Sequence, residues 1–89
     1  MYVATVTLTA TDAAARRQIA SPLVTDILWA AAVPADDLEH LHSRAVPERI
    51  DLTFFHRSPD PERADAAAVR ICRRALDTSP ALRGWVLHR

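Results

Sequence analysis

The feature that most constrains this chain is a pair of segments, residues 36–45 and 49–57, that flank the short stretch VPER. In the second segment, RIDLTFFHR, large apolar side chains recur at every other position, at Ile50, Leu52 and Phe54. Successive side chains of a β-strand point to opposite faces of a sheet, so this alternation is typical of a strand with one buried face. We therefore predict a β-hairpin whose turn lies in VPER.

The first arm of this hairpin has an alternative, because Leu38, Leu41 and Ala45 also fall at the spacing of a short helix. We favour the hairpin, since a loop over residues 46–49 lets both arms direct their buried side chains to one face, and that face sets the register. The pairs that this register directs toward the core are Ala45 with Ile50, Ser43 with Leu52, and Leu41 with Phe54. The pairs on the opposite, open face are Arg44 with Asp51, His42 with Thr53, and His40 with Phe55.

The rest of the chain alternates between strand and helix patterns. Residues 2–10 alternate as a strand, and residues 12–33 are predicted to be helical, with Ser21-Pro22 as either a kink or a second helix start. Residues 58–80 carry acidic side chains early and arginines late, an arrangement that complements a helix dipole. Residues 82–89 close the chain as a last strand.

The resulting order is strand, helix, strand, strand, helix, strand. It predicts a single α+β domain over residues 1–89, with a four-stranded antiparallel sheet and two helices on one face. Two stretches, LEHLHSRAVPERIDLTFF and RRALDTSPALRGWVL, resemble small uncharacterised proteins of high-GC bacteria with the ferredoxin-like βαββαβ fold. The resemblance implies this fold and brings no catalytic motif. Because the fold hosts ligand sensors, RNA binders, small oxygenases and interaction modules, it implies no activity by itself.

Three of the four histidines lie in the hairpin, which raises the question of a metal site. Alternation directs His40 and His42 to the open face and His56 to the helix side, so the three do not share a coordination sphere. Zinc needs further ligands, and the nearest candidate on the open face is Asp51. We therefore predict no metal site.

Composition and motifs exclude several other classes of function. The single Cys72 rules out an internal disulfide and a cysteine zinc site, and the single Gly84 rules out a glycine-rich phosphate loop. The formal net charge is zero and the basic residues, all arginine, form no run, so we expect no nucleic-acid or membrane partner. No stretch approaches the ~20 apolar residues of a membrane span, and no signal sequence is evident, so we expect a cytoplasmic protein without a cofactor.

The open face of the sheet is the candidate binding surface. The expected anchors are Phe55, His42, Arg44, His40, Asp51 and, if the last strand turns that side outward, Trp85. We expect a non-enzymatic protein-interaction or regulatory module that acts through the open face or a sheet edge as a homodimer. The alternative is a small dimeric α/β-barrel enzyme or small-molecule-binding protein, with His40, His42 and Asp51 as acid and base groups in a cavity between two sheets.

Overall fold

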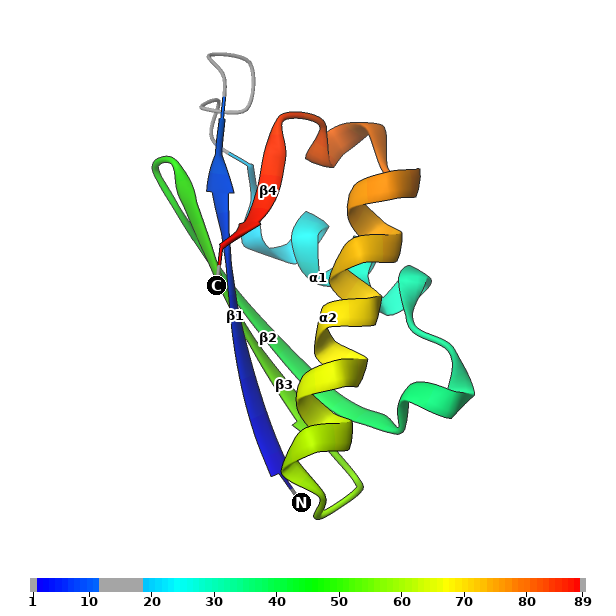
Figure 1. Cartoon of the computed structure of the whole chain (residues 1–89). Helices are drawn as coiled ribbons and strands as arrows, with labels where there is room; N and C mark the ends of the chain where they lie inside the picture. Colours follow the sequence, from blue (N-terminus) through cyan, green and yellow to red (C-terminus); the bar gives the residue numbers. More distant parts are fainter. Residues whose placement is uncertain (1, 12–18, 89) are drawn as a thin grey trace.

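The computed structural model describes residues 2–11 and 19–88 and confirms the predicted order of elements (Figure 1). The strands are β1 (Tyr2–Ala10), β2 (Leu38–Val46), β3 (Arg49–His56) and β4 (Trp85–His88). The helices are α1 (Ser21–Ala31) and α2 (Pro61–Thr78), with two short 3₁₀ turns, η1 (Pro34–Asp36) and η2 (Pro80–Leu82).

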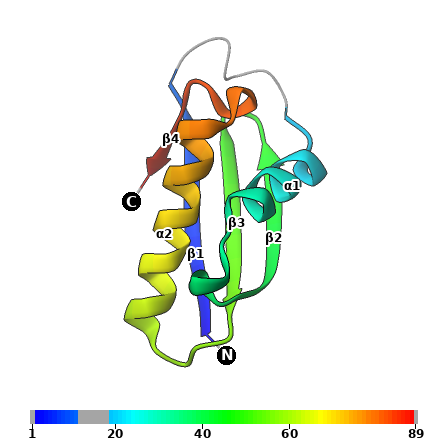
Figure 2. The same cartoon turned by 90° about the vertical axis from the view of Figure 1, so that its right-hand side faces the viewer.

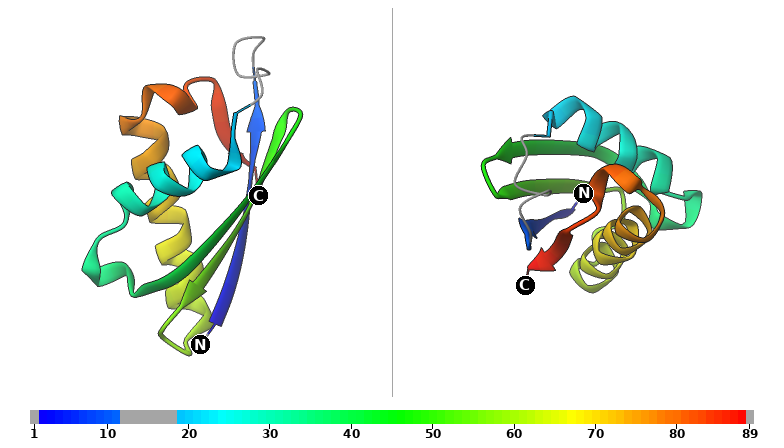
Figure 3. Two further views of the ribbon diagram at one scale, coloured as in Figure 1. Left: turned by 180° about the vertical axis from the view of Figure 1, so that it is seen from behind. Right: turned by 90° about the horizontal axis from the view of Figure 1, so that it is seen from above.

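The four strands form one antiparallel sheet in the order β2-β3-β1-β4, which is the ferredoxin-like arrangement. Both helices lie on the same side of this sheet, α1 over β2 and α2 over β1 (Figures 2 and 3). In the part of the chain that the structure describes, no helix or strand covers the other side. The sheet therefore has one face packed against helices and one face open, as predicted.

The hairpin of β2 and β3 has the predicted register along most of its length. Its turn is tighter than expected: Val46 pairs with Arg49, so only Pro47 and Glu48 connect the strands, and Glu48 takes a positive φ of 67°. At the other end a β-bulge between Leu38 and His40 places Leu38 opposite His56. The shorter turn leaves the register unchanged, because the extra pair of Val46 with Arg49 continues the same ladder as Ala45 with Ile50.

Helix α1 begins at Ser21 with Pro22 in its first turn, so the Ser-Pro pair marks a helix start rather than a kink. The first part of the longer predicted helix, residues 12–18, lies outside the described residues. Two hydroxyl contacts join α1 to the edge strand β2: Thr25 Oγ1 donates to Ser43 Oγ at 3.0 Å, and the Ala45 N–H donates to Ser21 Oγ at 2.9 Å. These contacts satisfy a polar side chain at a core position and a backbone donor of an edge strand.

Helix α2 is capped by Asp60, whose carboxylate accepts the Glu62 N–H at 3.0 Å. Its buried side is built largely from small residues, which let the helix lie close to β1. Cys72 is on this side, and burial raises the pKa of its thiol to about 12. The thiol is therefore an inert core group.

The last strand does not turn Trp85 outward, so the condition on which Trp85 was expected as an anchor of the open face is not met. In β4, Trp85 pairs with Ala10 and Leu87 with Leu8, which puts both on the helix side; Trp85 is only 6% exposed. The opposite side of β4 carries Val86 and His88. Burying an indole and a leucine removes more apolar area from water than burying a valine and an imidazole, so this orientation is favoured.

Candidate functional site

The open face consists of the outward side chains of all four strands, and cross-strand pairing arranges them in rows. The rows are His40–Phe55–Val3; His42–Thr53–Thr5; Arg44–Asp51–Thr7–His88; and Val46–Arg49–Thr9–Val86. Five of the six expected anchors lie on this face, and Trp85 does not. His88 on β4 and His42 on β2 are at opposite edges of the sheet.

One end of the open face is apolar and aromatic. His40 and Phe55 are in contact, with ring centroids 5.4 Å apart and ring planes tilted by 49°. Val3 continues this row on β1 and is 44% exposed, and Val86 at the other end of the face is 43% exposed. Val3 and the two rings therefore form one apolar group at this end of the face, and Val86 is separate from it.

The row that contains Arg44 and Asp51 carries charged side chains, and the charge of Asp51 is neutralised by an arginine of the same face. Asp51 Oδ1 lies 3.2 Å from Arg49 Nε and accepts a hydrogen bond from Thr7 Oγ1 at 3.5 Å. Arg44 lies opposite Asp51 in the register, but this carboxylate forms its ion pair with Arg49. The pairing of Asp51 thus involves the arginine of the neighbouring row rather than Arg44.

The acid and base candidates of the alternative function share the face but do not form a hydrogen-bonded set. Asp51 is one row away from His42 and two rows away from His40. Its carboxylate is engaged by Arg49 and Thr7 rather than by an imidazole. A general base needs a partner within hydrogen-bond reach, so this protomer alone offers no catalytic dyad here.

A second polar cluster lies on the helix side and was not recognised in the sequence. Asp36 is 2% exposed, accepts the Val33 N–H at 2.9 Å and forms ion pairs with Arg70 and Arg74. Arg74 Nε also donates to the Ala31 carbonyl at 2.9 Å. The cluster therefore joins the connection between α1 and β2 to the middle of α2.

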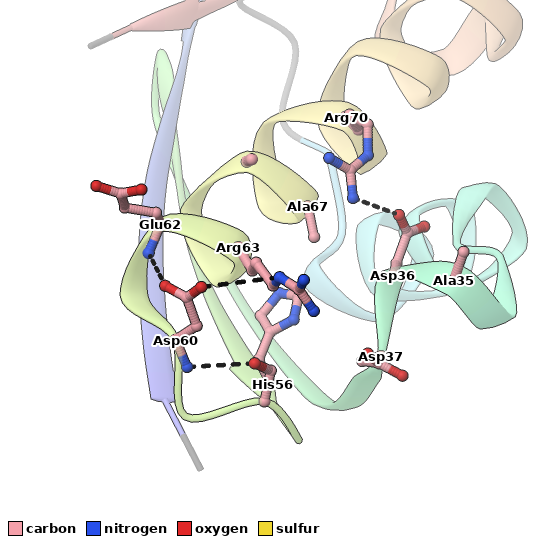
Figure 4. Close-up of a pocket in the computed structure, with 11 residues that line it drawn as sticks. Ala35, Asp36, Asp37, His56, Asp60, Glu62, Arg63, Ala67 and Arg70 are labelled. Atoms are coloured by element: carbon pink, nitrogen blue, oxygen red, sulfur yellow. Dashed lines mark hydrogen bonds and ion pairs between the residues drawn. The ribbon is translucent and has the colours of Figure 1, made fainter.

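Beside this cluster is a pocket of about 590 Å³ between η1 and the first turns of α2 (Figure 4). Its lining includes His56, which is 1% exposed and whose Nε2 has no hydrogen-bond partner among the described residues. Asp37 also lines the pocket, but it is exposed and takes a left-handed φ of 52°, so it does not pair with Asp36.

The sequence contains an indication of the two arginines of this cluster, but not of their contact with Asp36. Arg70 and Arg74 are four residues apart, which puts them on one face of a helix, and Asp36 follows Pro34 in a polar connection. The pattern indicates which side of α2 is basic, but it does not indicate that a carboxylate 34 residues away in sequence from Arg70 meets it.

Neither surface has the composition of a metal centre. Among residues 2–11 and 19–88 no group of three or more His, Cys, Asp or Glu side chains is arranged to hold a metal ion. Over the same residues, no helix is both long and apolar enough to cross a bilayer.

Comparison with known proteins gives no match: no family model, no curated protein and no solved structure is similar to this chain. The fold implied by the resemblance to small proteins of high-GC bacteria is present, while no family is identified.

Proposed function

We propose that this chain is a non-enzymatic interaction or regulatory module that forms a homodimer through the open face of its sheet. The observation that carries the proposal is that one complete face of the sheet is uncovered in the described chain, and that this face exposes Val3 beside Phe55 at one end and Val86 at the other end. An antiparallel sheet tolerates water on one face, but apolar side chains on that face favour a second layer.

The size of the open face fits one partner protein. Each strand residue covers about 3.4 Å along the strand and about 4.8 Å across it, so the four strands present roughly 500 Å² in projection. The accessible area is larger than this projection, because side chains protrude from the sheet, and it approaches the roughly 800 Å² per partner of a standard interface. A face-to-face dimer would use nearly all of it.

The charges of the open face favour a second copy over a strongly charged partner. Asp51 is the one carboxylate in the rows of this face, and it is paired with Arg49. Two copies related by a two-fold axis therefore meet with few like charges, and Arg44 remains at the edge strand, where water or the partner's polar groups can solvate it.

Within this dimer Phe55 is the expected anchor. It lies on β3, inside the sheet rather than at an edge, and it is flanked by His40 and Val3 in the same row. A half-buried aromatic ring surrounded by smaller contacts is the usual composition of an interface hot spot. His42 and Arg44, on the neighbouring rows of β2, supply the polar contacts around it.

Sedimentation equilibrium of the wild type, Phe55→Glu and Trp29→Glu tests the proposal. Trp29 is a matched control, because it is an exposed aromatic on α1 and lies away from the open face. At about 50 μM protein, a dimer with a micromolar Kd is mostly associated. We expect a dimeric wild type, a dimeric Trp29→Glu and a monomeric Phe55→Glu, each folded by circular dichroism.

Two results would contradict the proposal: a wild type that is monomeric under these conditions, or a Trp29→Glu variant that dissociates as much as Phe55→Glu. A dimer that retains a cavity between its sheets, lined by His40, His42 and Asp51, would favour the small-molecule-binding alternative.

A further inference from the structure

The pocket between η1 and α2 lies on the other side of the sheet from the open face, and its properties do not depend on dimer formation. Its walls include Ala35, Ala66 and Ala67, whose small side chains leave the space unfilled. Figure 4 shows the His56 imidazole directed from the end of β3 toward this space, between the start of α2 and η1.

His56 is the first sign that the pocket takes a ligand. Its side chain is almost completely buried, and Nε2 has no partner among the described residues. Buried polar atoms in folded proteins nearly always have a hydrogen-bond partner, and one that lacks a partner in the protein calls for an explanation, such as a bound water, an ion or a functional role. A group that enters the pocket and accepts a hydrogen bond would satisfy this imidazole.

Arg70 is the second observation that favours a ligand, because Asp36 is also bound by Arg74 and by the Val33 N–H and so does not depend on Arg70 alone. The Arg70 Nη2 atom lies 3.5 Å from Asp36 Oδ1, at the outer limit of a hydrogen bond, and the Arg70 side chain is 52% exposed. If Arg70 turns away, Asp36 keeps both Arg74 and the Val33 N–H. Arg70 can therefore bind a ligand without leaving a buried carboxylate unpaired.

The charges divide the pocket into a basic floor and an acidic rim. At the floor, Asp36 is paired with Arg70, which lines the pocket, and also with Arg74, which lies outside the lining; Arg74 therefore balances the carboxylate and leaves the charge of Arg70 in excess. At the rim, Asp60 is paired with Arg63 at 3.7 Å, while Asp37 and Glu62 are exposed; Figure 4 shows the Glu62 carboxylate directed away from His56. A single negative charge suits the floor, and a polyanion would be repelled at the rim.

We propose that this pocket binds a small monocarboxylate molecule, with its carboxylate between Arg70 and the Nε2–H of His56. Arginine binds carboxylates through two parallel N–H donors, which explains why this cation rather than a lysine suits the site. The rest of the ligand lies against the alanine wall. The acidic rim then favours a ligand whose outer end is neutral or carries an amino group.

The test uses propionate and L-alanine, which share a carboxylate and differ by the amino group, with inorganic phosphate and potassium chloride as comparisons. The readout is the nuclear magnetic resonance signal of the His56 imidazole, identified by its loss in His56→Gln. We expect a saturable shift of this signal with propionate, a Kd of about 1 mM or tighter, and a stronger response to L-alanine. Phosphate and chloride should give a weaker response.

Three variants distinguish a built site from general charge attraction. Arg70→Gln should weaken propionate binding about tenfold or more, because it removes a charge-assisted donor. Arg73→Gln makes the same charge change on an exposed position of α2 that does not line this pocket, and it should leave binding unchanged. Ala66→Leu fills the pocket from an exposed helix position and should abolish the shift without unfolding the chain.

The proposal fails if the His56 signal does not respond to propionate or L-alanine at about 50 mM, far above a millimolar Kd. It also fails if Arg73→Gln weakens binding as much as Arg70→Gln, or if Ala66→Leu binds normally. The dimer proposal is judged separately, because none of these variants changes the open face.

Discussion

Asp36 offers the sharpest test of what holds the helix layer together. The perturbation is Asp36→Asn, which removes the negative charge and keeps the shape of the side chain and an oxygen that can accept the Val33 N–H. The guanidinium groups of Arg70 and Arg74 then face a neutral amide. Because both arginines are partly exposed, each can turn toward water, which limits the loss.

The magnitude follows from the two unequal ion pairs. Arg74 bonds closely to a carboxylate that is almost fully buried, so losing this charged contact should cost about 1.5–3 kcal/mol. The Arg70 guanidinium lies farther from Asp36, at 3.5 Å, and its side chain is about half exposed. Its ion pair therefore contributes about 0.2–1 kcal/mol. We expect Asp36→Asn to lower the free energy of unfolding by about 2–4 kcal/mol. Asp36→Ala, which also loses the Val33 bond, should cost about 1 kcal/mol more.

Urea denaturation followed by circular dichroism measures this loss. A small domain has a urea m-value of about 1 kcal/mol/M or somewhat more, so the midpoint of Asp36→Asn should fall by about 2 M. Arg74→Gln should reproduce most of the effect and Arg70→Gln little of it. A variant Asp36→Asn within about 0.5 kcal/mol of the wild type would refute the reasoning, as would an Arg70→Gln variant more destabilised than Arg74→Gln.

Two further predictions concern the core. The raised pKa of Cys72 keeps its thiol protonated, so it should not react with a thiol reagent at pH 8 in the folded protein and should react rapidly in urea; equal rates in both would contradict its burial. Trp85→Ala should cost about 3–5 kcal/mol in unfolding free energy, whereas Val86→Ala on the open face should cost less than about 0.5 kcal/mol if measured on the monomer. The reverse order would mean that β4 presents its other side to the helices.

The sequence by itself determined the parts of the fold that depend on local periodicity. Alternation in residues 38–56 was sufficient to pair Arg44 with Asp51 and His40 with Phe55, because a shift by one residue would turn every apolar side chain to water. The same reasoning separated His56 from His40 and His42. The Ser21-Pro22 pair, one of whose two predicted meanings was a helix start, lies at the beginning of α1 in the structure, because proline favours the first turn of a helix irrespective of distant contacts.

Only the tertiary structure decided the features that depend on contacts between distant segments. The four residues of β4 are compatible with either orientation by alternation, and the packing of Trp85 against the helix layer selects one. Asp36 becomes a buried ion-pair partner only because α2 passes beside η1, and the pocket at His56 exists only because alanines line both of its walls. Periodicity describes which face of one element is buried, but the space between two elements depends on side chains from both, and no single segment contains that information.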